Sequence, residues 1–354
     1  MELGGQFHVA RNMPYVMKRG LNVSFKICII GCGNMAINGH GPSYRKYAAL
    51  YPDVELAACC DIDEMKASFF KREFGFGKFY TDMDVMLDTE KPDAVCMVVP
   101  AHLTSTLAVK ILEKGYPLLL EKPPGMNRNE TIDIIRAARK RNVSNQVAFN
   151  RRYIHLVRQL KGLLEEHNGI DRSMNIQYKM LRVGRKDIDF ATTAIHGIDL
   201  VRFLAASDYR TIRFHYQEMD HIGKNVVNVN MFCEFESGAY AQLGFFPVSG
   251  SIAEHLEINV YNHTFSLNLP LEASMASPGR LLYKENNEVK MEFADRDILE
   301  SMEGFVLSGF YEENKSFFED IRNGRKPTGD IESGLQSVEI VDCIRNRIPE
   351  YRLG

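Results

Sequence analysis

The stretch FKICIIGCGNMA at residues 25–36 decides the N-terminal fold, because a short apolar run leads directly into a glycine-rich turn. The run over 27–30 is continuously apolar, as expected for a strand buried on both faces of a parallel sheet. In the turn, Gly31 permits a tight bend, Gly33 lets a phosphate approach the backbone, and Ala36 lets a helix pack closely on the strand. A G-x-G-x-x-A pattern between a strand and a helix therefore predicts a dinucleotide-binding turn.

The helix expected over 35–50 gives an electrostatic reason for the same prediction. Unpaired N–H groups in its first turn and the positive end of its dipole favour a pyrophosphate there. We expect the whole turn, including Asn34 and Met35, to bind the cofactor. A second apolar run over 54–60 ends at Asp61, whose carboxylate can bind the adenosine ribose and repels a 2′-phosphate. NAD is therefore predicted rather than NADP, although Asp61 could instead only cap the following helix.

Strands and helices alternate over residues 25–149, which is typical of a doubly wound parallel sheet, the Rossmann fold. Over 210–293, β-rich runs predict a large, mostly antiparallel open sheet with helices on one face. We therefore expect an α/β Rossmann domain over 25–149 and an α+β domain over 150–354 that binds substrate and mediates oligomerisation. A last helix over 330–346 is a candidate to pack back on the first domain.

The composition excludes several classes of protein. A net charge of −3 over 354 residues lacks the positive excess that nucleic-acid binding requires. No apolar run has the length of a membrane span, and residues 1–24, predicted to be a disordered extension, contain no signal-peptide core. Seven cysteines, several of them in apolar runs, predict buried thiols in a reducing cytoplasm. The Cys28/Cys32 spacing has no second pair, so no metal site is expected.

Five short motifs occur in a fixed order along the chain. They are G-x-G-x-x-A at 31–36, Pro-Ala-His at 100–102, Glu-Lys-Pro at 121–123, Phe-Asn-Arg-Arg at 149–152 and His-Gly-Ile-Asp-Leu at 196–200. Through these motifs the chain resembles the glucose-fructose oxidoreductase, inositol dehydrogenase and rhizopine catabolism (Gfo/Idh/MocA) family, over about residues 25–350. The motifs together are specific for the family, but none is specific for a substrate.

The resemblance implies that Glu121 and Lys122 lie at the nicotinamide end of the cofactor, with Lys122 reaching the substrate hydroxyl. Pro100 and His102, at the carboxyl edge of the sheet, are expected to contact the cofactor. Desolvation destabilises the charge of a lysine that follows an apolar strand, so this lysine can transfer a proton or stabilise an alkoxide. A simply solvated lysine is the ordinary alternative at such a position.

The resemblance also makes His196 the general base, because a neutral imidazole can accept the alcohol proton as hydride leaves. A lone histidine that begins an amphipathic helix is otherwise usually structural. The family usually has an aspartate four residues earlier, whereas this chain has Thr192, a substrate-binding candidate that carries no charge. Asp187, Asp189 or Asp199 could replace the missing carboxylate.

The motif at 149–152 supplies two further substrate-binding candidates. Arg151 and Arg152 could bind a polar or anionic substrate group, or could be surface residues that form ion pairs. We expect Lys122 and His196 to converge on the substrate carbinol, each supplied by a different domain.

The predicted function is that of an NAD-dependent dehydrogenase acting on a secondary alcohol of a sugar, inositol or related polyol. One alternative is a glycosidase or lyase that recycles bound NAD within each turnover. Another is a non-catalytic NAD-responsive regulatory protein, which only the threonine at position 192 favours. Retention of Lys122 and His196 favours an enzyme. The family and a broad β-rich face over 225–269 imply a homodimer or homotetramer.

Overall fold

The computed structural model describes residues 24–167, 174–187, 189–271, 279–298 and 302–354. The chain folds into two compact units. Unit 1 runs to Ala148 and includes Phe310–Ser333, and unit 2 comprises Phe149–Gly309 and Gly334–Gly354. The predicted disordered extension lies, except for Ser24, outside the described residues. Among the described helices, none is long and apolar enough to cross a membrane.

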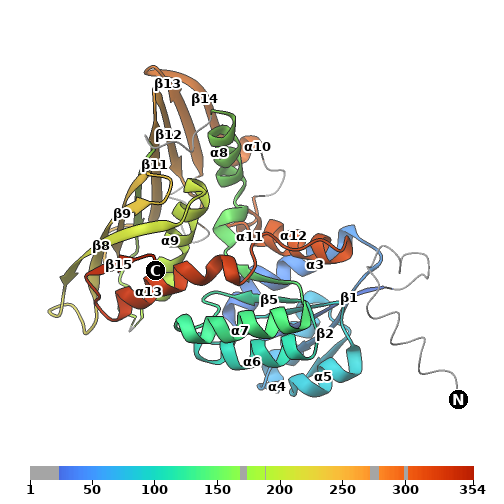
Figure 1. Cartoon of the computed structure of the whole chain (residues 1–354). Coiled ribbons are helices and arrows are strands. Elements are labelled where there is room, and N and C mark those ends of the chain that lie inside the picture. The colour runs from blue at the N-terminus through green and yellow to red at the C-terminus, as the bar shows by residue number, and fades with distance from the viewer. Residues whose placement is uncertain (1–23, 168–173, 188, 272–278, 299–301) are drawn as a thin grey trace, which may run out of the picture. The chain divides into compact units, whose positions relative to one another are not determined.

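Unit 1 is built on a six-stranded parallel sheet with the strand order β3-β2-β1-β4-β5-β6 (Figure 1). Its strands are β1 Phe25–Ile30, β2 Val54–Cys60, β3 Lys78–Tyr80, β4 Ala94–Met97, β5 Leu118–Glu121 and β6 Asn145–Ala148. Every residue of β4, β5 and β6 is buried, as expected for a parallel sheet covered by helices on both faces. The predicted doubly wound Rossmann sheet is therefore confirmed.

The helix expected over 35–50 consists of two parts. A π-helical turn, η2 Ala36–His40, comes first, and α3 Gly41–Leu50 follows it. The N–H of Gly41 bonds to the carbonyl of Ala36, five residues back, so this turn is one residue wider than an α-helical turn. The remaining helices of unit 1 are α4 Glu64–Phe74, α5 Met83–Glu90, α6 Ala101–Glu113, α7 Arg128–Arg141 and α12 Phe310–Arg322.

The division of the chain differs from the predicted boundary in its C-terminal part. Helix α12 was expected in the second domain, but it packs on α3 and belongs to unit 1. Arg322, at the end of α12, pairs with Asp53 at 2.7 Å and donates to the Tyr47 hydroxyl at 3.1 Å. These contacts join residues about 270 positions apart, so no local sequence pattern could predict them.

Helix α13 (Leu335–Arg345), expected to return to the first domain, belongs to unit 2 and packs on α9 (Ala191–Ala205). The Gln336 amide bonds to both backbone groups of Tyr209, accepting at 3.0 Å and donating at 2.9 Å. The periodicity of the sequence predicted the helix but not its contacts, because Tyr209 and Gln336 lie 127 positions apart.

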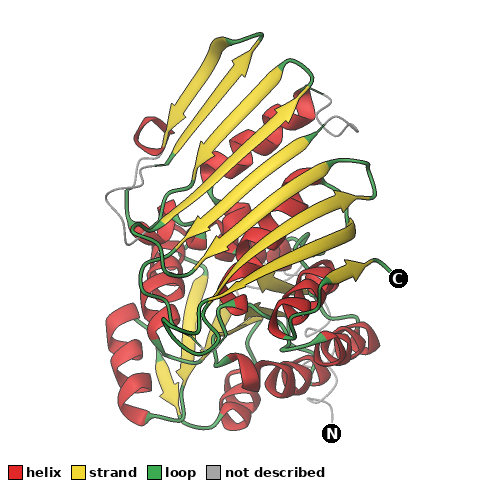
Figure 2. Cartoon of the chain, turned by 90° about the vertical axis from the view of Figure 1, so that its left-hand side faces the viewer, coloured by secondary structure: helices red, strands yellow, loops and turns green. Residues whose placement is uncertain are grey.

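Unit 2 carries a nine-stranded sheet with the order β14-β13-β12-β11-β7-β10-β9-β8-β15 (Figure 2). Among the described strands of this sheet, only β7 and β10 pair in parallel, which confirms the predicted mostly antiparallel sheet. The strands are β7 Asn175–Leu181, β8 Tyr209–Glu218, β9 Val227–Phe235, β10 Tyr240–Phe246, β11 Ala253–Val260, β12 His263–Asn268, β13 Arg280–Glu285, β14 Glu288–Ala294 and β15 Glu350–Arg352.

Helices of unit 2 pack against this sheet through α8 (His155–Glu166) and α9, which contact β12 and β7 respectively. Burial alternates along β9, where every second residue is buried, so one face of the strand packs against the core. The other short helices are η3 Asn150–Tyr153, α10 Asp295–Ile298, α11 Gly304–Leu307 and, at the boundary between the units, η4 Glu332–Gly334.

Candidate active site

The glycine turn follows β1 in unit 1 and has the geometry that a phosphate-binding loop needs. Gly31 has a φ of 94°, and a Cβ there would lie 1.9 Å from the carbonyl oxygen of Val98, so only glycine fits. A Cβ on Gly33 would meet nothing within 4 Å, so open space faces this part of the turn. The residues present therefore fit a pyrophosphate that approaches the backbone closely.

Asp61 is tied directly to the glycine turn. Its Oδ2 accepts the N–H of Cys32 at 2.8 Å, and its Oδ1 accepts the N–H of Asp63 at 2.9 Å. Helix α4 has a separate N-cap, Asp63, whose side chain accepts the N–H groups of Met65 and Lys66. Asp61 therefore does not serve only as the cap of α4. Its half-exposed carboxylate lies beside the turn, where an adenosine ribose would be bound.

The Glu-Lys-Pro motif begins at the last residue of β5, and the Lys122–Pro123 peptide bond is cis. The buried Glu121 accepts the backbone N–H of Lys122 through Oε2 at 3.0 Å, and its Oε1 lies 3.1 Å from Nε2 of His40. Burial alone would raise the pKa of Glu121, but the His40 contact and the Lys122 charge outweigh burial and lower it. The side chain of Glu121 therefore favours its ionised form.

His40, at the end of the π turn, is a buried residue of this region that no sequence motif predicted. Besides Glu121, it contacts Asn314 of α12, with 3.2 Å between Nδ1 and the amide oxygen, and the Tyr44 hydroxyl, also at 3.2 Å. A histidine nine residues after Gly31 was visible in the sequence. Its partners Glu121 and Asn314 lie 81 and 274 residues further along, however, and no local pattern connects them.

Pro100 and His102 follow β4. Helix α6 begins at Ala101, so His102 lies in its first turn. Both side chains are exposed at the carboxyl end of a central strand. Their expected contact with the cofactor stays a prediction.

His196 lies in α9 of unit 2. The helix begins at Ala191, five residues earlier than predicted, so His196 is in its second turn and Thr192 in its first. The Thr192 hydroxyl donates to the carbonyl of Asp189 at 2.8 Å and so helps to form the start of the helix. Because four residues separate them in one helix, Thr192 and His196 share a face of α9.

Each of the three aspartates that could have replaced the missing carboxylate is bound by an arginine. The pairs are Arg185–Asp187 at 2.7 Å, Arg345–Asp189 at 2.8 Å and Arg152–Asp199 at 2.7 Å. A permanent cation therefore neutralises the charge of each aspartate. All three carboxylates are already paired with arginine and do not replace the missing carboxylate as a free charge.

Arg151 belongs to a second buried ion-pair network. Its Nε donates to Oε2 of the fully buried Glu254 at 2.7 Å, and Arg182 and the Tyr178 hydroxyl bond to the same carboxylate. Burial opposes ionisation, but the two arginines lower the pKa of Glu254 to about 2. Tyr178 also packs against Gly197, where a Cβ would lie 2.3 Å from the ring. The network therefore supports α9 at the residue next to His196.

These contacts bear on the two interpretations of the arginines at 151 and 152. Each guanidinium makes hydrogen bonds to a buried carboxylate within unit 2. The arrangement favours the ion-pair interpretation, but in a buried setting rather than at the surface. A role in binding substrate stays a prediction.

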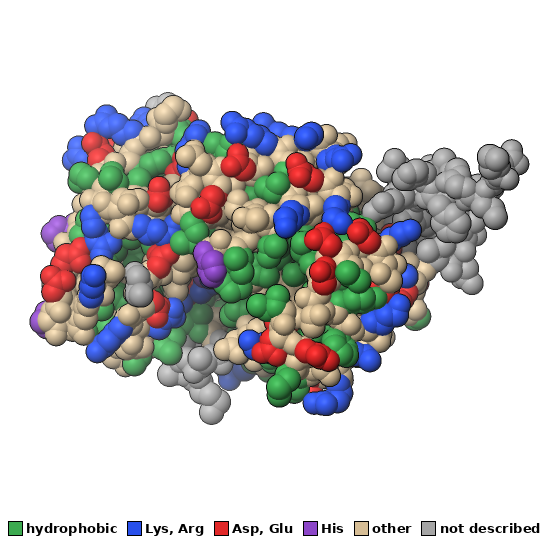
Figure 3. Space-filling view, turned by 90° about the horizontal axis from the view of Figure 1, so that it is seen from below, with side chains coloured by type: hydrophobic (Ala, Val, Ile, Leu, Met, Phe, Trp, Pro, Cys, Tyr) green, Lys and Arg blue, Asp and Glu red, His purple; other side chains and the backbone are tan. Residues whose placement is uncertain are grey.

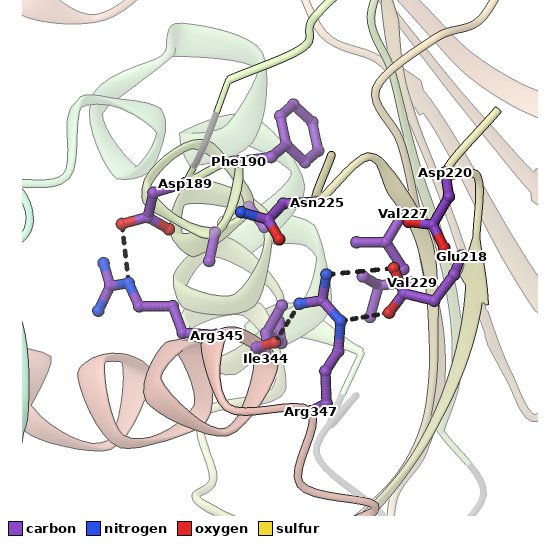
Figure 4. Close-up of a pocket in the computed structure, with 12 residues that line it drawn as sticks. Asp189, Phe190, Glu218, Asp220, Asn225, Val227, Val229, Ile344, Arg345 and Arg347 are labelled. Carbon is purple, nitrogen blue, oxygen red and sulfur yellow. Dashed lines mark hydrogen bonds and ion pairs between the residues drawn. The ribbon is translucent and has the colours of Figure 1, made fainter. Parts of the chain in front are cut away.

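A pocket of about 500 Å³ lies at the start of α9 within unit 2 (Figure 4). Ala191 and Ala194 line it, whereas His196 is rotated by about 200° from Ala194 and so lies on the opposite side of the helix. Two lining arginines are paired with lining carboxylates, Arg345 with Asp189 and Arg347 with Glu218 (Figure 4). This pocket is thus separate from the face of α9 that carries the candidate base.

The surface adds one observation about partners. On the described surface seen in Figure 3, acidic and basic side chains are interspersed, and no continuous basic patch covers this face. The distribution agrees with the small net charge of −3.

Residues 25–149, which contain the glycine turn and the Glu-Lys-Pro motif, match the model of the family described as "Oxidoreductase family, NAD-binding Rossmann fold" (GFO_IDH_MocA). The N-terminal Rossmann domain, residues 25–149, thus belongs to the Gfo/Idh/MocA family. The predicted resemblance to this family is thereby confirmed for that domain.

Several dehydrogenases resemble this chain at low identity. Myo-inositol 2-dehydrogenase of Thermotoga maritima is 21% identical over 351 residues, which cover 92% of this chain and 97% of the relative. D-glucoside 3-dehydrogenase of Escherichia coli is 28% identical over 146 residues, but the match covers only 41% of this chain and 40% of the relative. A dehydrogenase from Chromobacterium violaceum has the same fold, with a TM-score of 0.79 and 21% identity over 92% of this chain and 95% of that structure.

Proposed function

We propose that this protein is an NAD(H)-dependent dehydrogenase that oxidises a secondary alcohol on a sugar, inositol or related polyol. The observation that carries the proposal is the arrangement in unit 1. The glycine turn follows β1, Asp61 bonds to that turn, and Lys122 comes directly after Glu121, the last residue of β5 in the same sheet. Ligands of such sheets bind at the carboxyl ends of the strands. The names of the inositol and glucoside dehydrogenases above support the substrate class.

The turn and Asp61 would hold the cofactor, because Gly33 leaves the backbone open to a pyrophosphate and Asp61 stands beside it. Bound NAD+ supplies the hydride acceptor for the carbinol carbon. Asp61 would accept hydrogen bonds from the ribose hydroxyls and repel a 2′-phosphate, which favours NAD over NADP. Lys66, the next basic residue along the chain, has its ammonium 3.6 Å from Asp63.

Two residues would carry the proton chemistry. Lys122 would stabilise the negative charge that develops on the substrate oxygen, or move its proton. His196 would accept the proton as general base, with Thr192 on the same face of α9 as a neutral hydrogen-bonding group. Because the Glu254 network fixes Tyr178 against Gly197, the helical turn that presents His196 has firm support.

Thr192 is the one observation that favours a second candidate, a non-catalytic NAD-responsive binding protein. In that case the chain would bind NAD without turning over any substrate. The presence of both Lys122 and His196 favours an enzyme, because a binding protein needs neither a general base nor a group that stabilises an alkoxide.

The test is a panel of sugars and inositols incubated with NAD+ while the absorbance of NADH is followed. Accumulating NADH supports the dehydrogenase. Product formation without net NADH identifies a glycosidase or lyase that recycles its cofactor. Binding of NAD with no product from any compound identifies the regulatory alternative.

We also propose that the chain forms a homodimer or homotetramer through the sheet of unit 2. The support is the long sheet itself, whose strands pack on helices α8 and α9 and which leaves Phe232 of β9 exposed. Sedimentation at micromolar concentration tests the proposal, and a species with the mass of one chain would refute it. The seven cysteines, none in a disulfide, agree with the expected reducing cytoplasm.

A further inference from the structure

His40 occupies a buried position directly behind the Glu-Lys-Pro motif. Only 1% of its surface is exposed, and its two ring nitrogens face different partners. Nε2 faces the Glu121 carboxylate at 3.1 Å, and Nδ1 faces the Asn314 amide oxygen at 3.2 Å. Whether each partner donates or accepts a hydrogen bond determines which ring nitrogens carry protons.

Asn314 determines the state of Nδ1. Its amide nitrogen donates to the carbonyl of Phe310 at 2.7 Å, so its oxygen is the atom that points at His40. An amide oxygen can only accept a hydrogen bond, and Nδ1 must therefore carry a proton. The Tyr44 hydroxyl, 3.2 Å from the same nitrogen, offers a second acceptor oxygen.

The contact on the other side of the ring then requires one further proton. With Nδ1 protonated, either an imidazolium donates from Nε2 to a carboxylate, or a protonated Glu121 donates to a neutral imidazole. Glu121 already accepts the backbone N–H of Lys122 through its other oxygen. That bond and the charge of Lys122 both favour the carboxylate.

Four other titratable groups face this pair from the surrounding elements. Burial raises the pKa of the Tyr44 hydroxyl well above its usual value and that of the Cys96 thiol to about 12, so both stay neutral. Lys122, after β5, supplies a positive charge. Glu313 of α12 is a fully buried carboxyl group whose charge acts on Tyr44 and Cys96, and any test must separate it from Glu121.

We propose that His40 is a positioning residue that carries protons on both ring nitrogens, keeps Glu121 ionised and thereby stabilises the ammonium form of Lys122. The carboxylate lies between the imidazole and the backbone of Lys122, with one oxygen toward each. The consequence for catalysis rests on the proposed dehydrogenase function. The protonation of the pair does not depend on it.

Nuclear magnetic resonance of protein labelled with ¹⁵N-histidine tests the protonation directly. At a mildly alkaline pH, where an ordinary solvated imidazole is neutral, His40 should still show the nitrogen shifts of an imidazolium. In Glu121→Gln it should become neutral with its proton on Nδ1. Wild-type His40 found neutral, with an unprotonated Nε2, would overturn the proposal because Glu121 would then hold the proton.

Glu313→Gln is the matched control, since it removes a buried carboxyl group near the same residues and leaves the His40–Glu121 contact intact. His40 should remain an imidazolium in this variant. A neutral His40 in Glu313→Gln would identify Glu313 as its counterion and refute the assignment. The His40 signal is assigned by its loss in His40→Gln or, should that variant not fold, by its shift in Tyr44→Phe.

The kinetic test uses His40→Gln, which can donate a hydrogen bond to Glu121 but cannot hold the extra proton. Without the second proton of His40, Glu121 should take up a proton and no longer stabilise the ammonium form of Lys122. The limb of the pH profile of kcat/KM that reports the ionisation of Lys122 should therefore move to lower pH, whether Lys122 acts in its charged or its neutral form. A profile identical to that of the wild type would contradict the positioning role. If the wild type has no activity, the proposed function fails while the NMR result still decides the state of the pair.

Discussion

Glu121 in unit 1 and Glu254 in unit 2 are both buried carboxylates, but different cations hold them. Glu121 adjoins Lys122, and Glu254 supports the helix of His196 through Tyr178. Glu254 is bound by two arginines, which do not lose their protons in proteins. Glu121 is bound by His40, whose ring, unlike a guanidinium, can carry either one proton or two. An ion pair between arginine and glutamate can only fix geometry. A pair between histidine and glutamate can also change its number of protons when a neighbouring charge changes. The comparison therefore assigns rigid support to unit 2 and proton-sensitive support to unit 1.

The largest expected effect comes from removing the two residues that these carboxylates support. Lys122→Ala and His196→Ala should each lower turnover about 10²–10⁴-fold, roughly 3–5 kcal/mol of transition-state stabilisation. NAD affinity should stay nearly unchanged, because neither residue is assigned to the pyrophosphate or the adenosine. Steady-state kinetics and a fluorescence titration with NAD measure the two effects.

The exposed residues Lys110 and His215 offer controls of the same residue types, and their alanine variants should turn over normally. Full activity in Lys122→Ala or His196→Ala would remove that residue from the mechanism. Loss of NAD binding would instead reassign it to the cofactor site.

The permanent network should matter most for stability. Glu254→Leu leaves Arg151 and Arg182 buried without their shared carboxylate, and should lower the free energy of unfolding by about 3–5 kcal/mol. Glu257→Leu is the control, because Glu257 is an exposed glutamate on the same strand, and its loss should change stability by less than about 0.5 kcal/mol. Urea unfolding measures both, and equal stabilities of the two variants would contradict the account.

Acid should weaken the same network over a defined range. The pKa of Glu254 is lowered from 4.5 to about 2, so its contribution is complete above about pH 4.5 and is lost as pH falls toward 2. Urea midpoints measured across this range should fall less steeply in Glu254→Gln than in the wild type. Parallel curves for the two proteins would show that Glu254 is not ionised by its arginines.

The smallest expected effect concerns cofactor choice. If Asp61 repels a 2′-phosphate, NAD(H) should bind at least about tenfold more tightly than NADP(H), a difference of about 1.4 kcal/mol. Asp61→Ala should lose this preference, whereas Asp63→Ala, which removes only the α4 cap, should keep it. Fluorescence titrations of the wild type and both variants with each cofactor give the six affinities. Preference retained in Asp61→Ala would exclude Asp61 from the ribose site.

The sequence predicted well what is encoded locally. The apolar run before Gly31, the glycine turn and the alternation of strands and helices defined the Rossmann unit, because each depends on neighbouring residues. His40 and the partners of Arg151 and Arg152 were not predictable, since these contacts join residues 47 to 274 positions apart. The start of α9 was placed five residues late because Ala191–Ile195 lacks a capping signal before it.

The central claim is that hydride passes between a substrate carbinol and NAD with the help of Lys122 and His196. A substrate that turns over, deuterated at the reacting carbon, tests this claim most directly when the cofactor is analysed by mass spectrometry. The account predicts one deuterium in the NADH formed per turnover, and a large loss of labelled NADH in Lys122→Ala and His196→Ala although both still bind NAD. Deuterium that returns to the product, or labelled NADH formed equally fast by either variant, would contradict it.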